Sequence, residues 1–188
     1  AKYVDVKSFV DYFILNEASK NVDGYRLSTF LYKEKDSDGG KLFAGPAWDY
    51  NLAWWNADYC NGNLSTGWAY QFNSVCGGSS GETVPFWWNR MLQDTSFTSL
   101  LKCRWTELRQ TTLDIDTLFA FIDSNALYLD EAKDRHFQAW PILGIYTWPN
   151  PSPIPADYPG EIAAMKNWIQ QRFTWLDSHM PGVCTTTA

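Results

Sequence analysis

The most informative part of the chain starts at residues 16–23 with the sequence NEASKNVD and ends at residues 45–51 with GPAWDYN. Four side chains that can hold a metal ion or a proton stand at the ends of short apolar runs here: Asp23, Ser28, Asp49 and Asn51. A rigid scaffold usually presents its chemistry at such positions. We therefore expect the functional site in this segment.

The elements beside this segment follow from hydrophobic periodicity. Apolar residues recur at helical spacing over residues 6–14, after Asp5 as N-cap, and predict a helix that ends near Ser19. Residues 28–33 and 41–43 predict two strands, and the intervening DSDGG supplies glycines for a turn with positive φ. If these strands pair, both aspartates lie at the same end of the hairpin, where they can share a metal ion.

The combination of NVD at 21–23, FLY at 30–32 and WDYN at 48–51 resembles the CotH family of spore-coat-related atypical protein kinases. Residues 161–168 together with Arg172 are similar to the last helix of that family. The resemblance covers most of the chain but only the C-terminal, catalytic half of the family's domain.

The resemblance implies a diverged kinase-like fold that binds ATP with Mg²⁺ and phosphorylates a protein substrate. It implies that Asp23 is the catalytic aspartate that orients the acceptor hydroxyl, and that Asp49 binds the cofactor by holding Mg²⁺ against the phosphates. The second metal ligand of the family is often Asn, whereas this chain has Ser28, a weaker and neutral ligand that argues against full kinase activity. Asn51 adds a further oxygen ligand. By spacing alone, Asp23 also fits a turn and Asp49 a loop cap.

Composition limits the choice of partners. The 188 residues include 45% apolar residues, enough for one core, and carry a net charge of −6. An acidic chain without a basic cluster does not suit nucleic acid. No apolar run approaches 18 residues, so we expect no membrane span. The 11 Trp residues favour a packed aromatic core, although stacked Trp can also bind a glycan.

The four cysteines indicate the compartment. Cys60 and Cys76 bracket a loop rich in Gly, Asn and Ser, as a disulfide would, and Cys103 would then pair with Cys184. Four cysteines allow three connectivities, so this pairing is a hypothesis. With no Cys-x-x-Cys pair and two His in the chain, a zinc site is not expected. If the disulfides form, the protein is extracellular or on the cell surface.

The remaining chain reads as mostly helical. Apolar stripes predict helices over residues 84–92, 97–108 and 118–129, and we interpret all three stripes as core-facing. Residues 51–82 show little periodicity and are either a substrate loop or an insertion packed on the core. Arg26 fits a salt bridge or a phosphate contact, but we prefer a solvent-exposed position.

The C-terminal part combines charge, proline and one long helix. Residues 131–135 predict an exposed, mixed-charge turn or helix end, and the prolines of 141–159 predict an extended strap. The last helix is expected over residues 160–178. Arg172 lies on its buried face and would need a buried carboxylate partner.

Together these elements predict one α+β unit, mostly helical with one small β-hairpin, like the C-lobe of a diverged kinase-like fold. We expect residues 1–188 to be a single CotH-like domain fragment, its C-terminal portion without the N-terminal lobe, because no candidate for that lobe's phosphate-binding Lys is found.

The sequence leaves several functions open. The first is the catalytic half of an atypical kinase, inactive as an isolated fragment. The second is a secreted module that binds carbohydrate or a surface without catalysis, and the third is a structural coat or cell-surface protein. A glycoside hydrolase ranks last, because no two carboxylates stand out at the required separation.

Overall fold

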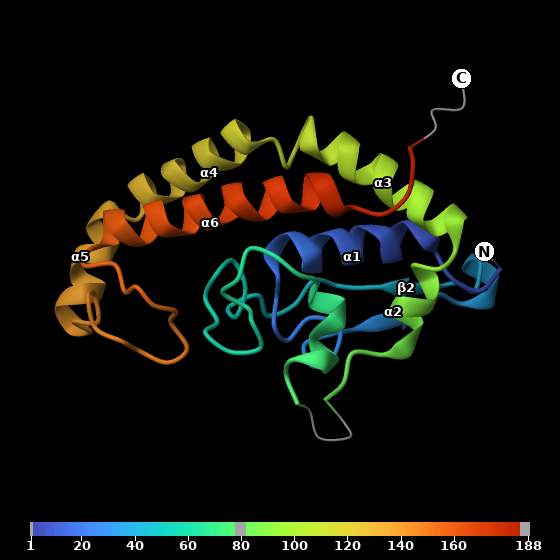
Figure 1. Cartoon of the computed structure of the whole chain (residues 1–188), viewed down its shortest axis with the longest axis horizontal. Helices are drawn as coiled ribbons and strands as arrows, with labels where there is room; N and C mark the ends of the chain where they lie inside the picture. The colour runs from blue at the N-terminus through green and yellow to red at the C-terminus, as the bar shows by residue number, and fades with distance from the viewer. Residues whose placement is uncertain (1, 78–81, 185–188) are drawn as a thin grey trace.

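Helix α1, Val6–Ser19, lies at the centre of the computed structural model, which describes residues 2–77 and 82–184 (Figure 1). Its N-cap is Asp5, as predicted, whose carboxylate accepts a hydrogen bond from the main-chain N–H of Ser8 at 2.8 Å. The helix ends at Lys20, which takes the left-handed conformation at φ 48°. Nine of its residues are buried, so α1 is a core helix with neighbours on most sides.

A short antiparallel hairpin follows α1. Strand β1, Leu31–Lys33, pairs with β2, Leu42–Ala44, and Tyr32 stands opposite Phe43. The turn contains the 3₁₀ helix η1, Asp36–Asp38. The predicted hairpin is therefore confirmed, although β1 starts three residues later than expected.

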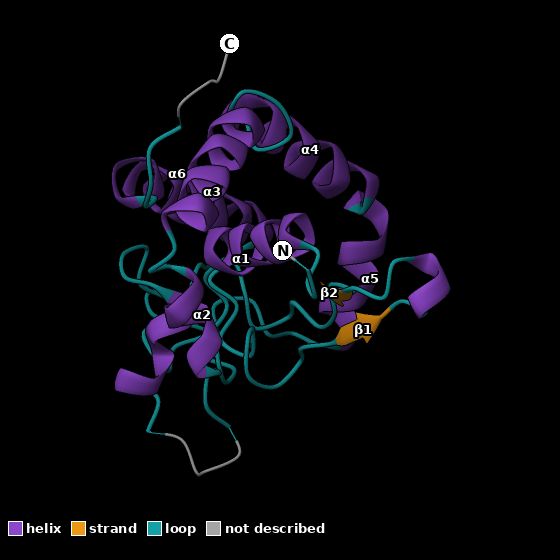
Figure 2. Cartoon of the chain, turned by 90° about the vertical axis from the view of Figure 1, so that its right-hand side faces the viewer, coloured by secondary structure: helices purple, strands orange, loops and turns teal. Residues whose placement is uncertain are grey.

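The helices above and below α1 form two layers. In Figures 1 and 2, α3, α4 and α6 cover one side of α1, while α2, the hairpin and the loops lie on the other. The remaining elements are η2 (Ala69–Ser74), α2 (Phe86–Met91), α3 (Thr95–Arg109), α4 (Ile115–Tyr128), α5 (Asp130–Ala139) and α6 (Tyr158–His179). The described chain is thus mostly helical with one two-stranded sheet, as the sequence predicts.

Three local expectations need correction. Residues 131–135 lie inside α5 and do not form a turn. Helix α6 begins two residues early, because Pro159 is tolerated in the first turn and the carboxylate of Asp157 caps Gly160 N at 2.8 Å. The stripe on α4 is only partly core-facing, since none of its residues is buried.

The core is rich in aromatic side chains, and two disulfides cross-link the chain. Phe13, Trp88 and Trp105 are at most 2% exposed, which agrees with the expectation of packed Trp. Disulfides join Cys60 to Cys76 and Cys103 to Cys184, the pairing proposed from the sequence. Among the helices of the described residues, none is long and apolar enough to cross a bilayer.

Candidate functional site

A buried amide brings the two predicted site aspartates to one place. The Asn21 side chain is fully buried; its Nδ2 donates to the main-chain oxygen of Asp49 at 3.3 Å, and its Oδ1 accepts from the main-chain N–H of Asp23 at 3.2 Å. The two segments also share a main-chain hydrogen bond, from Val22 N to Leu52 O at 3.1 Å. The end of α1 and the segment after the hairpin therefore run side by side, each carrying one aspartate.

Asp49 lies in a turn with its side chain held by a second predicted residue. Its φ of 60° is in the left-handed region, which Asp tolerates better than most residues. The Ser28 hydroxyl donates to Asp49 Oδ2 at 3.2 Å, so the structure brings these two residues into contact. Asn51 follows two residues later and is exposed, and its main-chain oxygen accepts from Asn56 Nδ2 at 2.9 Å. A metal-binding role of Asn51 stays a prediction.

Arg26 is not solvent-exposed, contrary to our preferred interpretation. Its side chain is 7% exposed and its Nη2 lies 3.8 Å from Asp23 Oδ1. Its Nε donates to Val22 O at 2.9 Å and its Nη1 to Glu82 O at 3.3 Å. Main-chain oxygens and Asp23 together replace the water that the guanidinium loses on burial, which is why an arginine is tolerated here.

The site carries an excess of negative charge. Burial raises the pKa of the Asp23 carboxyl, Arg26 lowers it, and the carboxylates of Asp49 and Glu82 raise it further. Burial also raises the pKa of the Tyr59 hydroxyl, and Asp23 adds to that effect, so Tyr59 borders the same region. Two carboxylates that repel each other in a half-buried place favour a bound cation.

The donor set suits Mg²⁺ better than a metal that needs a full protein cage. Among residues 2–77 and 82–184, no three His, Cys, Asp or Glu side chains gather at one point. Mg²⁺ is usually held by one or two carboxylates together with phosphate oxygens and water. Asp49, with Asp23 nearby and the Ser28 hydroxyl in contact, meets that requirement.

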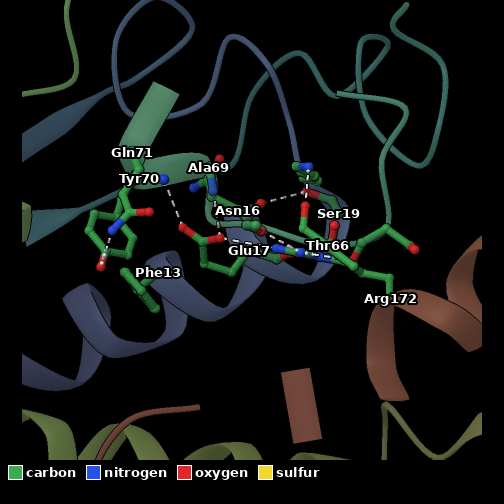
Figure 3. Close-up of polar contacts among 12 residues, drawn as sticks. Phe13, Asn16, Glu17, Ser19, Thr66, Ala69, Tyr70, Gln71 and Arg172 are labelled. Carbon is green, nitrogen blue, oxygen red and sulfur yellow. Dashed lines mark hydrogen bonds and ion pairs between the residues drawn. The ribbon is translucent and has the colours of Figure 1, made fainter. Parts of the chain in front are cut away.

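Behind the site, Glu17 and Arg172 form a fully buried ion pair (Figure 3). Both side chains are 0% exposed, and Arg172 Nη2 lies 3.2 Å from Glu17 Oε2. Arg172 also donates to the main-chain oxygens of Glu17 at 2.9 Å, Ser65 at 3.1 Å and Gly67 at 2.6 Å. The buried carboxylate that Arg172 was predicted to need is therefore Glu17.

The Glu17 carboxylate is saturated with donors. Main-chain N–H groups of Ala69 and Tyr70 each donate to it at 2.9 Å, and the Tyr25 hydroxyl donates at 3.0 Å. Burial raises the pKa of Glu17, while Arg172 and these three donors lower it. The pair thus satisfies the hydrogen-bond requirement of a buried charge.

Lys20 fixes the same loop from the end of α1. Its Nζ, on a side chain that is 2% exposed, donates to the main-chain oxygens of Asn61 at 2.7 Å, Leu64 at 2.7 Å and Thr66 at 2.6 Å. Burial and the nearby Arg172 lower the pKa of Lys20 to about 7. The aromatic loop after Asp49 is therefore anchored on the core by three charged side chains.

Sequence reasoning missed the roles of Asn21, Glu17 and Lys20. Asn21 belongs to the quoted NVD motif, but its bridging function depends on a segment 28 residues away. Glu17 and Lys20 carried a weak signal, because they are charged residues that follow shortly after the apolar run at 12–15.

Comparison with known proteins gives one match. Residues 1–176 match the family described as CotH kinase protein, which is nearly the whole chain. Neither the curated proteins nor the solved structures contain a significant match. The family match includes every residue of the site described above, and the chain belongs to the CotH kinase protein family.

Proposed function

We propose that the protein transfers the γ-phosphoryl group of ATP, with Mg²⁺, to a hydroxyl group on a protein. The observation that carries this proposal is the Asn21 bridge, which holds Asp23 and Asp49 together within the segment that matches the CotH family. Phosphoryl transfer depends mainly on positioning and on neutralising charge, and two rigidly placed carboxylates can serve both needs.

The two aspartates take different roles. Burial raises the pKa of the Asp23 carboxyl, and Asp23 is the group that orients the acceptor hydroxyl and receives its proton. Arg26, 3.8 Å from Asp23, lowers the pKa of that carboxyl and so opposes the effect of burial. Asp49, with the Ser28 hydroxyl 3.2 Å from its Oδ2, holds Mg²⁺. When bound, Mg²⁺ neutralises charge on the phosphate oxygens.

The role of Asp49 is tested by calorimetric titration of Mg-ATP into the intact protein. Asp49→Asn is expected to abolish measurable binding, because it removes the charged metal ligand while keeping the shape of the side chain. Asp38→Asn is the matched control, since Asp38 lies in the exposed 3₁₀ turn of the hairpin and makes the same change in charge. Equal affinity of the two variants would contradict the proposal.

The role of Asp23 is tested by the rate of phosphate transfer to an acceptor protein and not by the affinity for Mg-ATP. We expect Asp23→Asn to bind Mg-ATP as tightly as the wild type does and to lower kcat by about 10²-fold or more, the usual contribution of a general base. Phosphate incorporation into a protein acceptor, followed with γ-labelled ATP, measures this. A fall in both affinity and kcat would assign Asp23 to metal binding instead.

We also propose that the protein works outside the cytoplasm, at a cell surface or in a coat. The two disulfides support this location, because such bonds persist in oxidising compartments. Membership of a family known from spore coats agrees with it.

A further inference from the structure

A groove separate from the two aspartates lies between the aromatic loop, the proline-rich strap and α6. It consists of two adjoining cavities of about 160 Å³ and about 380 Å³. Both cavities are lined by Trp55, Ile154 and Pro155, so these three residues mark the point where they meet. The larger cavity alone is within the range of about 300–1,000 Å³ that ligand sites commonly have.

The lining of this groove is aromatic and polar but almost uncharged. Glu161 is the one charged side chain among the described residues that line it. Side-chain amides and hydroxyls surround the aromatic centre on both sides: Asn56, Asn150 and Glu161 line the smaller cavity, and Asn63, Ser65, Ser152, Asn167 and Gln171 line the larger.

This combination matches the chemistry of a neutral saccharide. A pyranose ring has apolar C–H faces, which pack on an indole, and a rim of hydroxyls that each donate and accept hydrogen bonds. Asn and Gln side chains also donate and accept, so each can bond a hydroxyl that does both. A phosphate-bearing ligand would meet no Lys or Arg along the groove, and an acyl chain would bury the amides without partners.

The walls of the groove are held in place before any ligand binds. Trp54 N donates to Ser19 O at 2.7 Å, which ties the aromatic loop to the end of α1. On the other wall, the Trp168 indole donates to Asn63 O at 2.8 Å and joins the loop to α6. Asp58 N donates to Pro149 O at 2.9 Å and joins the loop to the strap. Such preorganisation lowers the entropic cost of binding.

The backbone at the centre of the groove is strained. Trp54 and Trp55 have φ values of 55° and 83°, a conformation that bulky residues rarely adopt. Strain of this kind is retained where the surrounding structure uses the resulting side-chain direction. Both residues line the smaller cavity, and Trp55 lines the larger one as well.

We propose that this groove binds a neutral saccharide chain, with a sugar ring stacked on Trp55 and hydroxyls bonded by Asn167 and Gln171. The binding site is distinct from the aspartates and does not depend on the phosphotransferase activity. Saccharide binding would hold the protein on a glycan-bearing surface.

The test is calorimetric titration with four neutral hexasaccharides: β-1,4-linked glucose, N-acetylglucosamine, xylose and mannose. We expect at least one to bind, and Trp55→Ala to weaken that binding about tenfold or more. Trp140→Ala is the matched control, because Trp140 is 65% exposed and lies outside both cavities. Asp49→Asn should also leave saccharide binding unchanged, which separates this site from the nucleotide site.

Asn167→Ala and Gln171→Ala provide a second test that does not disturb the core, since both residues are exposed on α6. Each should weaken binding about fivefold, the equivalent of one lost hydrogen bond. Failure of all four hexasaccharides to bind would overturn the proposal. Binding that survives both exposed variants, or that is lost in Trp140→Ala, would overturn it as well.

Discussion

At the scale of single residues, the buried ion pair of Glu17 and Arg172 joins helix α1 to helix α6. The two side chains are fully buried and each makes further hydrogen bonds to the aromatic loop. A buried ion pair adds little stability compared with an apolar pair, but the loss of one partner leaves an uncompensated charge in the core. The integrity of the loop therefore depends on both charges being present together.

Glu17→Gln should lower the free energy of unfolding by about 3–5 kcal/mol, because Arg172 then lacks its counter-charge. The double variant Glu17→Gln, Arg172→Met should recover part of this loss. Urea unfolding followed by circular dichroism measures both.

The control for this cycle is an exposed pair. Asp11 and Arg104 lie 2.8 Å apart with side chains 51% and 36% exposed, so Asp11→Asn should change stability by less than about 1 kcal/mol. If Glu17→Gln costs no more than Asp11→Asn, the buried pair does not hold the loop.

Asp23→Asn should increase the free energy of unfolding at pH 7. Burial raises the pKa of Asp23, so the folded state binds a proton more readily than the unfolded state, and the ionised carboxylate disfavours folding at neutral pH. Asparagine removes that penalty, while Arg26 keeps its two main-chain acceptors.

The advantage of Asp23→Asn should shrink as the pH falls through the raised pKa of Asp23, and it should be gone below about 3.9, where the carboxyl is protonated in the folded and unfolded states alike. Thermal unfolding between pH 3 and pH 7 checks this. A variant that is less stable than the wild type at pH 7 would show that the Asp23–Arg26 contact outweighs the cost of burial.

At this scale, the sequence predicted a contact correctly where a buried residue type requires a particular kind of partner. A buried Arg172 requires a carboxylate, and the structure supplies one. The identity of that carboxylate was not predictable, since Glu17 is 155 residues away and no pattern links the two. The position of Arg26 was predicted wrongly because its main-chain acceptors leave no trace in the sequence.

At the scale of elements, helix starts were the most predictable feature. Asp5 was expected as an N-cap, and its carboxylate accepts a hydrogen bond from the main-chain N–H of Ser8. The carboxylate of an Asp at this position satisfies donors that the first turn leaves free, and this requirement is local. The start of α6 and the extent of α5 were less predictable, because proline and mixed charges are compatible with both a first turn and a loop.

The disulfide between Cys103 and Cys184 attaches the end of the described chain to α3. It closes a loop of 81 residues, and its removal by Cys103→Ser with Cys184→Ser should lower the free energy of unfolding by about 2–5 kcal/mol. Urea unfolding of the double variant measures this loss.

Mass mapping under non-reducing conditions gives an independent check of the connectivity. The expected peptides join Cys60 to Cys76 and Cys103 to Cys184. Four free thiols in protein isolated from an oxidising compartment would contradict the structure and the proposed location.

At the scale of the whole molecule, stability is unevenly distributed. Helices α4 and α5 contain no buried residue, whereas α1 has nine. In Figure 1, α4 continues from the end of α3 and packs along α6, and α5 lies at the end of the molecule away from α3. The apolar stripe on α4 packs on α6 and against the edge of the core, but its residues stay only partly buried.

Amide hydrogen exchange should be faster in α4 and α5 than in α1, by about 10²-fold or more, because local opening there exposes little apolar surface. Mass spectrometry of peptic fragments resolves these helices. Equal protection of α4 and α1 would show that the molecule opens as one unit.

The fold class was predictable from periodicity, and the candidate site residues were proposed from motif resemblance, but their arrangement in space could not be predicted. Neither level of reasoning identified Asn21 as the bridge, because its two partners belong to segments that meet only in three dimensions. The groove around Trp55 could not be predicted from the sequence either, since the strap and α6 that line it lie about a hundred residues further along the chain.

The buried pair also has a consequence for synthesis on the ribosome. Glu17 leaves the exit tunnel 155 residues before Arg172. Until Arg172 emerges, packing of α1 against the aromatic loop would bury a carboxylate without its counter-charge. The core around α1 therefore cannot be completed during synthesis before α6 has emerged.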